Sequence, residues 1–321
     1  MKKKPSHSLG ILLCALLLLS LSACRRADQE NKPTPLRIGV LPILDALPLY
    51  VAESEGYFSS QGIAVDLIPV ASAAERDQLM QAGQIDGVIN DLVSVALYNR
   101  ETPQITVVRF AMQSTDHYAQ FKILAAPNAN IQRIVDIKGK TIGTSEGTII
   151  QYVTERLLEA EGLNDQDFTQ LAIPKIPDRM ALLEAGEIQA ATLPEPLATL
   201  AMQKGASVIL DDRQYPQYAC SVISISKKFI EDQPETIKDF LTALEQATDL
   251  INADKETWST LLVEKKIIPP SLSGTYDLPD YPSAAIPTEA QFSDILLWLE
   301  EKEEISLNAT YENSIDASFL P

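Results

Sequence analysis

Cysteine and histidine are scarce in this chain of 321 residues, which contains three cysteines and two histidines. Cys14 lies inside an N-terminal apolar run and Cys24 directly follows it, so only Cys220 remains in the body of the chain. One cysteine cannot build a disulfide framework. The Cys/His spacing of a zinc site is also missing, so we expect no metal ion and no cofactor.

Activated nucleophiles are hard to find as well. The sequence has no Walker loop, and Cys220 has no local partner that would activate a thiol. His117, the one histidine beyond the N-terminal segment, could contact a ligand, although an exposed surface position is more typical of histidine. We therefore expect no catalytic residues and a protein that is not an enzyme.

Positive charge is in short supply. The chain has 26 Lys and Arg against 44 Asp and Glu, which gives a formal net charge of −18. Residues 1–23 contain three lysines and no acidic residue, so the chain that follows them carries about −21. Such a charge repels nucleic acid and anionic membrane faces, which excludes them as main partners.

Long apolar runs are missing too, apart from Leu9–Leu21 at the N-terminus. Its 13 residues are fewer than the roughly 20 that span a bilayer. With Lys2–Lys4 before it, the run is typical of a secretory signal, and the segment Leu21–Cys24 resembles a bacterial lipoprotein box. We expect a signal peptide over 1–23, lipid on Cys24 and a flexible tether over 24–35. The alternative is an ordinary signal peptide that is followed by a cysteine by chance. The protein would then be membrane-anchored and extracytoplasmic, in the periplasm or on the outer face.

Two pairs of similar segments divide the remaining chain into halves. Arg, Leu, Ala, Gly and Ile recur at an offset of 103 between Arg76–Ile85 and Arg179–Ile188. A second echo pairs Tyr50–Glu53 with Tyr152–Glu155, and each follows a strand-like run that ends in Ile-Gly. Strands that alternate with helices indicate parallel α/β sheets. About 285 residues also exceed what one core usually holds, so two lobes are expected.

Several segments, in order, resemble one family of binding proteins. They are Leu36–Val40, Leu47–Ala52, Glu55–Phe58, Gly62–Val65, Asp136–Gly143, Pro194–Pro196 and Lys228–Phe240. This pattern is similar to that of the nitrate/sulfonate/taurine-type substrate-binding proteins of ABC transporters, which include binders of thiamine-pyrimidine precursors. The resemblance implies a type II periplasmic-binding fold with two doubly wound lobes, two hinge strands and a ligand cleft between the lobes.

The resemblance also implies where the chain crosses between lobes. We place the crossings near Ser114–Lys122 and Tyr218–Ser224, so lobe 1 comprises 36–117 and 221–321 and lobe 2 comprises 118–220. Permease and ATPase subunits of the transporter are the expected partners of a monomeric chain. Some relatives are thiamine-pyrimidine synthases with a cysteine-rich motif and an iron site, which this sequence does not match. A ligand-sensing subunit for a signalling receptor is a further alternative, because one fold can serve both roles.

Four loops are candidates for the ligand site on physical grounds alone. Ligands of open α/β sheets bind beyond the carboxyl ends of the strands, where helix N-termini converge. The candidate residues in such loops are Asp45, Asn90, Asp91, Ser145, Gly147, Thr148 and Glu195. Asp and Ser at these positions also cap helices without any ligand, so each residue alone has a purely structural alternative.

The loop residues also indicate a ligand class. Asp45, Asp91 and Glu195 carry carboxylates, and the four loops contain no Arg or Lys. Carboxylates favour a ligand with N–H donors or positive charge, so a nitrogen-containing heterocycle or an amine is preferred, with sulfonate, taurine or nitrate next. The aromatic rings of Tyr118, Tyr152, Tyr215 and Tyr218 could stack on a ligand, but packing is the commoner role.

Lipidation at Cys24 gives a direct test of the export signal. Mass spectrometry of membrane-extracted protein should find a peptide that starts at Cys24 and carries the mass of a diacylglyceryl group. A mature protein with an intact, unmodified Cys24 would contradict this expectation.

Overall fold

The computed structural model describes residues 34–303 and 308–321. Residues 35–321 form one compact unit, and the expected signal peptide and Cys24 lie outside the described residues. None of the helices described is both long and apolar enough to cross a membrane.

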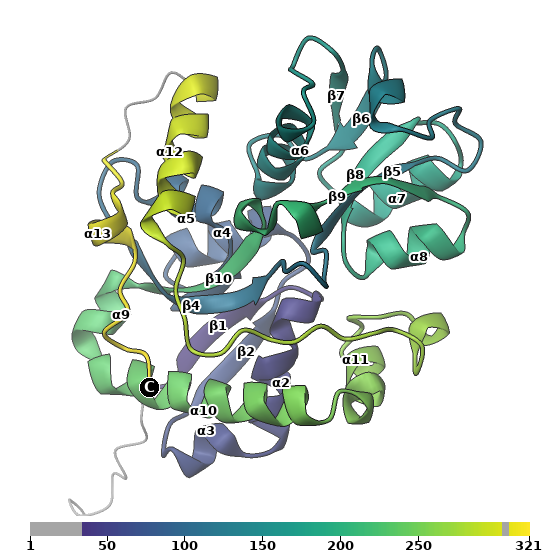
Figure 1. The fold of residues 1–321 in the computed structure, drawn as a ribbon. Coiled ribbons are helices and arrows are strands. Elements are labelled where there is room, and N and C mark those ends of the chain that lie inside the picture. Colours follow the sequence, from purple (N-terminus) through teal and green to yellow (C-terminus); the bar gives the residue numbers. More distant parts are fainter. Residues whose placement is uncertain (1–33, 304–307) are drawn as a thin grey trace, which may run out of the picture. The chain divides into compact units, whose positions relative to one another are not determined.

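The first of two sheets has the strand order β2-β1-β3-β10-β4 (Figure 1). Its strands are β1 (Leu36–Val40), β2 (Val65–Pro69), β3 (Gly87–Asn90), β4 (Ile105–Gln113) and β10 (Cys220–Ser226). β1 pairs in parallel with β2 and β3. Nearly every residue of β3, β4 and β10 is buried, as expected for strands covered on both faces.

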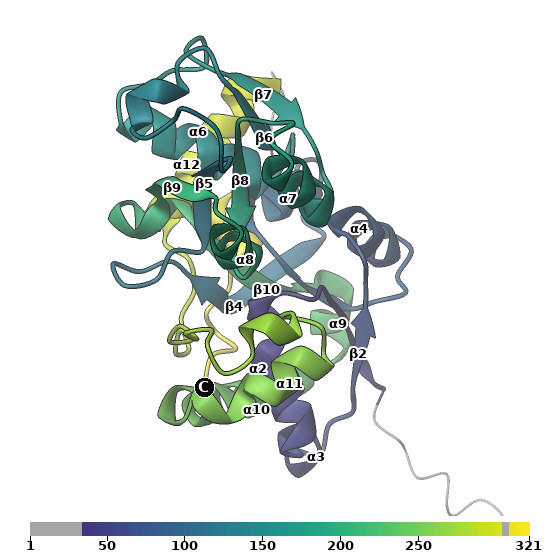
Figure 2. The same cartoon turned by 90° about the vertical axis from the view of Figure 1, so that its right-hand side faces the viewer.

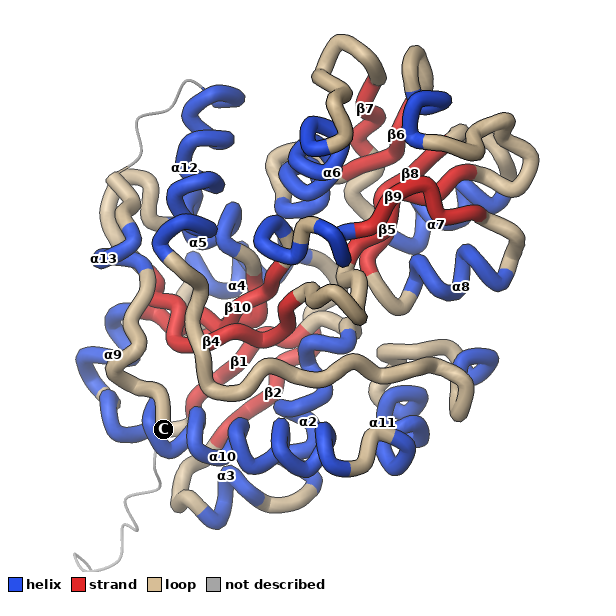
Figure 3. Tube along the Cα trace, viewed as in Figure 1, coloured by secondary structure: helices blue, strands red, loops and turns tan. Residues whose placement is uncertain are grey.

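The second sheet has the order β7-β6-β8-β5-β9. Its strands are β5 (Phe121–Ala125), β6 (Thr141–Thr144), β7 (Thr169–Ala172), β8 (Ala190–Pro194) and β9 (Ser207–Asp211). β6 pairs in parallel with β7 and β8. The strands of the two sheets can be followed in red in Figure 3.

The expectation of two α/β sheets of the periplasmic-binding fold is confirmed, but the sheets are mixed rather than parallel. β10 pairs antiparallel with β3 and β4, and β5 pairs antiparallel with β8 and β9. β5 and β10 are the strands that follow the two crossings between the sheets. Each enters its sheet from the crossing and therefore runs against the parallel strands.

Helices cover both sheets. They are α2 (Leu47–Ser54), α3 (Tyr57–Ser60), α4 (Ala73–Gln81), α5 (Leu92–Tyr98), α6 (Ile149–Ala160), α7 (Ile176–Glu184), α8 (Leu197–Gln203), α9 (Lys227–Asp232), α10 (Pro234–Ala253), α11 (Ser259–Glu264), α12 (Glu289–Glu303) and α13 (Tyr311–Ser314). α10 packs on α2 and α3, whereas α7 and α8 pack on β8 (Figure 2). α10 thus packs on helices of the first half of the chain, and the bounds of the two lobes stay a prediction.

The internal echo corresponds to one repeated packing arrangement. A Cβ atom added at Gly39 in β1 would lie 2.7 Å from Ile85 Cδ1, and one added at Gly143 in β6 would lie 2.8 Å from Ile188 Cδ1. Real Cβ atoms do not approach this closely, so a larger residue at either glycine would force the end of the isoleucine side chain to move. The helix before each isoleucine ends at a glycine with positive φ, +64° at Gly83 and +71° at Gly186.

α12 packs on α5, which follows a strand of the first sheet, and on α6, which follows a strand of the second. Trp298 and Phe292 are buried in a cluster that contains side chains from α5 and from α6. The indole N–H of Trp298 donates to Glu155 Oε2 at 2.7 Å, and Arg156 on α6 pairs with Asp294 on α12 at 3.0 Å. The sequence places α12 with the first lobe only, whereas its polar contacts also tie it to α6.

Trp298 and Leu297 provide a matched pair for measuring this packing. Trp298 is 2 % exposed and Leu297 is 56 % exposed. Trp298→Ala should lower the free energy of unfolding by about 3–5 kcal/mol, because it leaves a large cavity and removes the donor to Glu155. Leu297→Ala should change it by less than about 0.5 kcal/mol. Equal losses in urea unfolding would show that α12 is not anchored through Trp298.

Candidate functional site

Asp45 lies in a short 3-10 helix, Leu44–Ala46, that follows β1, and its side chain is buried. The hydroxyl of Ser221, at the start of β10, donates a hydrogen bond to Asp45 Oδ2. Burial raises the pKa of the Asp45 carboxyl, and the hydrogen bond from Ser221 opposes this shift. Asp45 does not accept a hydrogen bond as the cap of α2, so its expected alternative role as a helix cap does not apply.

Asn90 ends β3 and Asp91 follows it, and β3 pairs in parallel with β1, the strand that precedes Asp45. Asn90 Oδ1 accepts a hydrogen bond from Ser224 at 2.7 Å, but its buried Nδ2 has no partner among the described residues. Asp91 caps α5 by accepting from the Ser94 amide at 2.8 Å. Burial raises the pKa of Asp91, and the nearby Arg76 opposes the shift. Asp91 thus has the capping role, whereas Asn90 keeps a free donor.

Ser145, Gly147 and Thr148 lie in the loop between β6 and α6. Thr148 caps α6 by accepting from the Ile150 amide at 3.2 Å. Gly147 has φ +68°, and its amide donates to Gln151 Oε1 at 2.7 Å. Ser145 is buried, and its hydroxyl accepts a hydrogen bond from Arg179 at 2.9 Å.

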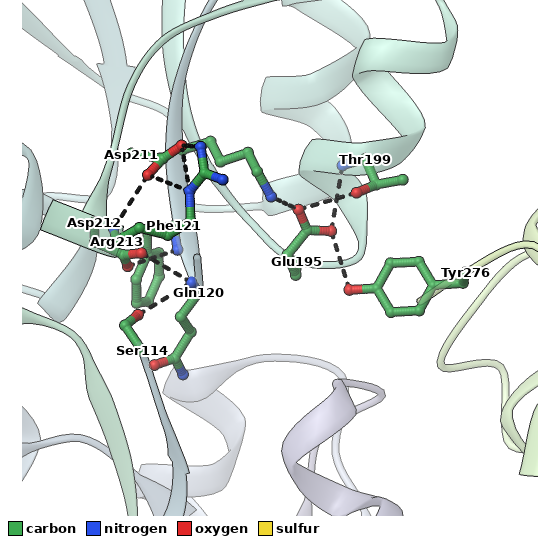
Figure 4. Close-up of polar contacts among 10 residues, drawn as sticks. Ser114, Gln120, Phe121, Glu195, Thr199, Asp211, Asp212, Arg213 and Tyr276 are labelled. Carbon is green, nitrogen blue, oxygen red and sulfur yellow. Dashed lines mark hydrogen bonds and ion pairs between the residues drawn. The ribbon is translucent and has the colours of Figure 1, made fainter. Parts of the chain in front are cut away.

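Glu195 follows β8 and is buried, with its carboxylate at the centre of a polar cluster (Figure 4). It forms an ion pair with Lys122 and accepts from the Thr199 hydroxyl at 3.0 Å. The hydroxyl of Tyr276 donates to Glu195 Oε2 at 3.2 Å. Tyr276 packs against the core of the first sheet, so Glu195 is reached from both sheets.

Lys122 and Tyr276 were not identified from the sequence as residues of the candidate site. The four loops contain no cation, as expected, but Lys122 reaches Glu195 from the neighbouring strand β5. The antiparallel register places Lys122 opposite Leu193, two residues before Glu195. A pairing register between distant strands leaves no local signal, and Tyr276 lies in a long connection without periodicity.

Tyr118, on the first crossing, packs against the core of the first sheet. Burial raises the pKa of its hydroxyl, and the neighbouring Tyr276, Glu195 and Asp45 add to the shift. The hydroxyl of Tyr118 is therefore influenced by candidate residues of both sheets, and its stacking role stays a prediction. Tyr152 has the packing role instead, since its ring lies edge-on to Trp298 at 5.5 Å.

The two chain crossings are tied together by Asp212 (Figure 4). Its buried carboxylate accepts from the amides of Gln120 at 3.0 Å and Phe121 at 2.8 Å, on the other crossing. His117 on the first crossing is exposed, and its Nε2 lies 3.5 Å from Asp116. His117 therefore has the surface position that is typical of histidine.

A crevice of about 610 Å³ lies away from these loops, along the sheet edge at β9. It is lined by Asp116, Val208, Ile209, Leu210, Asp211, Arg213 and Gln214. Arg213 and Asp211 satisfy each other there at 2.6 Å. The loops at the strand ends are the better candidate site, because they hold buried carboxylates and a buried donor without a partner.

Residues Gly143–Gly147 match the Gly-x-Ser-x-Gly pattern of hydrolase nucleophiles, with Ser145 at the position of the nucleophile. A nucleophilic serine needs a base within hydrogen-bond reach. The hydroxyl of Ser145 instead accepts from Arg179 at 2.9 Å and donates to the carbonyl of Pro174 at 3.4 Å. No histidine hydrogen-bonds to it among the described residues, so this hydroxyl lacks the base that would activate a nucleophile.

Residues 44–257 match the family model described as NMT1/THI5 like. The chain belongs to the NMT1/THI5-like family. The relationship expected from the sequence motifs is thereby confirmed, and the match spans all four candidate loops.

Named relatives and solved structures agree with this placement. A protein of Brachyspira hyodysenteriae whose name describes it as an ABC transporter periplasmic binding protein is one such relative. It is 22 % identical over 76 % of this chain and 73 % of its own length. The THI11 4-amino-5-hydroxymethyl-2-methylpyrimidine phosphate synthase of Saccharomyces cerevisiae is 23 % identical over 70 % of this chain and 65 % of its own. The aliphatic sulphonate binding protein SsuA of Escherichia coli superposes with a TM-score of 0.76 at 18 % identity, covering 88 % of this chain and 92 % of SsuA. The fold expected from the sequence is the fold of SsuA.

Asp212 gives a pH-dependent test of the crossing. Burial raises the pKa of its carboxyl to about 7 from 3.8, against the opposing hydrogen bond from the Phe121 amide. Between these values the folded protein keeps a proton that the unfolded chain releases. The free energy of unfolding should therefore fall as pH rises from about 4 to 7, by at most about 1.4 kcal/mol per pH unit from this group.

Asp212→Asn should remove that contribution and flatten the profile measured by urea unfolding. Asp45 and Asp91, whose pKa values are also raised by burial, would still contribute a slope of the same sign. Identical profiles for the variant and the wild type would show that Asp212 is ionised in the folded protein throughout this range.

Proposed function

We propose that this protein is an extracytoplasmic solute-binding lipoprotein that delivers a small polar molecule to an ABC importer. The fold it shares with SsuA and its relationship to a periplasmic binding protein support this role. The export signal read from the sequence fits the same role. Permease and ATPase subunits would then be its partners, with the lipid on Cys24 holding it at the membrane.

The proposed ligand is a small nitrogen-containing molecule, a heterocycle or an amine. The observation that carries this choice is the buried carboxylate of Glu195, which is contacted by Tyr276 from the other sheet. Asp45 adds a second buried carboxylate beside Tyr118. A carboxylate in a water-poor site binds N–H donors strongly, because charge-assisted hydrogen bonds are stronger than neutral ones.

A sulfonate, taurine or nitrate ligand is the second candidate, and Lys122 favours it. Lys122 neutralises Glu195 in this structure, so the acidic character of the site is smaller than its loops suggest. SsuA, by its name, binds aliphatic sulphonates. A synthase like the yeast relative would need an activated group, and the contacts of Ser145 do not supply one. A sensing subunit would use the same ligand site.

Glu195→Gln and Lys122→Met distinguish a ligand contact from an internal ion pair. If Glu195 binds the ligand, Glu195→Gln should weaken binding about ten- to a hundredfold, since a charged hydrogen bond is worth about 1.5–3 kcal/mol. Lys122→Met should leave that binding intact or strengthen it, because Lys122 competes for the same oxygen atoms. If Glu195 only holds Lys122, both variants should lose stability and neither should lose affinity.

The ligand for these measurements comes from a thermal-shift screen of nitrate, taurine, alkanesulfonates, aminopyrimidines, flavins and amines. A ligand at 100 times its dissociation constant adds about 2.7 kcal/mol of stability and should raise the midpoint by about 2–4 °C. A shift with aminopyrimidines or amines supports the preferred ligand class. A shift with sulfonates or nitrate alone overturns it in favour of the second candidate.

A further inference from the structure

α12 is anchored to the first sheet through the segments on either side of it. In the segment before α12, the carbonyl of Ala285 accepts a hydrogen bond from the amide of Phe110 in β4 at 2.8 Å. In the segment after it, α13 packs on β4, and the hydroxyl of Tyr311 donates to the carbonyl of Pro287 at 2.9 Å. α12 itself packs on α5, which follows β3. We therefore treat α12 as a part of the first sheet's half of the molecule.

Side chains of α12 also bind elements of the second sheet. Asp294 accepts hydrogen bonds from the Tyr152 hydroxyl at 2.6 Å and from Arg156 Nε at 3.0 Å, and both donors belong to α6. Gln291 donates to the carbonyl of Gln217 on the second crossing at 3.3 Å. α6 packs on β5, β6 and β8, so the bonds of Asp294 join α12 to the second sheet.

Glu155 on α6 strengthens this contact, because its carboxylate is buried and bound by two side chains of α12. Glu155 is 1 % exposed. Trp298 donates its indole N–H to the carboxylate at 2.7 Å, and Lys302 forms an ion pair with it at 3.0 Å. Lys302 also pairs with Asp165, which follows α6. Removing the cationic partner of a buried carboxylate is costly, so separation of α12 from α6 is opposed.

The two sheets touch a second time at the candidate site. Tyr276, which packs against the core of the first sheet, donates to Glu195 at 3.2 Å. Leu200 on α8 packs against the same core. This contact uses α8 and the connection that carries Tyr276, whereas the other uses α12 and α6 (Figure 1). Both contacts are made in the same arrangement of the sheets.

The two contacts are coupled through the elements to which they are attached. Glu195 and α6 belong to the second sheet, whereas Tyr276 and α12 belong to the first. A rotation at the crossings that separates Tyr276 from Glu195 therefore also displaces α6 against α12. The hydrogen bonds of α12 with α6, at 2.6–3.0 Å, weaken when their geometry is distorted. These bonds consequently favour the arrangement in which Tyr276 reaches Glu195.

We propose that α12 is a clasp, formed by Asp294, Trp298 and Lys302, that stabilises the closed arrangement of the sheets in which Tyr276 reaches Glu195. The clasp lies outside the candidate site and determines how much of the protein has a closed site. A solute that binds the closed arrangement binds more weakly when fewer molecules adopt it. This consequence rests on the proposed binding function, whereas the clasp itself acts without a solute.

Two spin labels measure the arrangement of the sheets directly. Met202→Cys on α8 and Glu264→Cys on α11 place the labels at exposed positions. α8 packs on strands of the second sheet, and α11 contributes to the core of the first. Cys220 is buried and stays unlabelled, and Cys14 and Cys24 are replaced by serine in the full chain. Pulsed electron paramagnetic resonance of the solute-free protein should then give one main distance.

Asp294→Ala removes the acceptor of Tyr152 and Arg156 and leaves every residue of the candidate site in place. The population with a longer distance should rise roughly tenfold relative to the main one, which is the value of one charged hydrogen bond. A triple variant adds Trp298→Phe and Lys302→Met, which removes the polar contacts of the clasp but keeps an aromatic ring in the packed position. In the triple variant the longer distance should dominate.

Two control variants separate the clasp from general effects on α12. Glu301→Ala removes an acidic group from an exposed position of the same helix and should leave the distances unchanged. Tyr311→Phe removes the bond to Pro287, which joins two segments on the side of the first sheet. It should lower stability in urea unfolding and also leave the distances unchanged.

The proposal is overturned if the triple variant keeps the distances of the wild type, or if its distances become shorter. It is also overturned if Glu301→Ala or Tyr311→Phe lengthens the distance as much as Asp294→Ala does. A failure of the proposed function gives a different result, since the label measurement needs no solute. Longer distances in the triple variant, in a protein whose midpoint no solute of the thermal-shift screen raises, would refute the binding function and leave the clasp. Solute binding with unchanged distances in the triple variant would refute the clasp alone.

Discussion

The polar chemistry of the site depends on the antiparallel pairing of the two strands that follow the chain crossings. β5 and β10 begin at the edge of their sheets where the parallel strands end. Lys122 is therefore carried to Glu195, and Ser221 is carried to Asp45. Without these two strands, each buried carboxylate would lack its nearest partner and would be costly to bury.

The crossings thus have a second role besides connecting the sheets. Asp212 on one crossing accepts hydrogen bonds from two amides on the other, so the two connections form one unit. Tyr118 lies on the same unit beside Asp45 and Glu195. A displacement of the crossings would change the surroundings of both carboxylates together, which is a physical route by which a ligand could couple to the arrangement of the sheets.

The internal repeat explains both the likeness and the difference of the two halves. Gly39 and Gly143 admit an isoleucine and an arginine at equivalent places, so the backbone arrangement is shared. In the first half Arg76 pairs with Asp77. In the second half the corresponding residues are Arg179 and Met180, so the acidic partner is missing at that position. Equivalent folds can therefore carry different charge, and this difference is a property of single side chains rather than of the architecture.

Much of the architecture could be predicted from the sequence. Local signals such as the C-terminal glycines Gly83 and Gly186, the alternation of strands and helices, and the repeat offset determined two α/β units and the loops at their strand ends. These signals act over a few residues, which is why the candidate loops could be named. The capping role of Asp91 was also foreseen as the alternative to ligand binding.

What only the tertiary structure decided is which side chains meet across long distances in the chain. The pairing of Lys122 with Glu195, the reach of Tyr276, and the contact of α12 with α6 join residues whose separation leaves no periodic trace. The same holds for Arg179, whose Nη1 donates to Ser145 while its buried Nε and Nη2 have no partner among the described residues. Local propensity follows from neighbouring residues along the chain, whereas the charge balance of a buried site follows from every element packed around it, and only the folded chain determines that set.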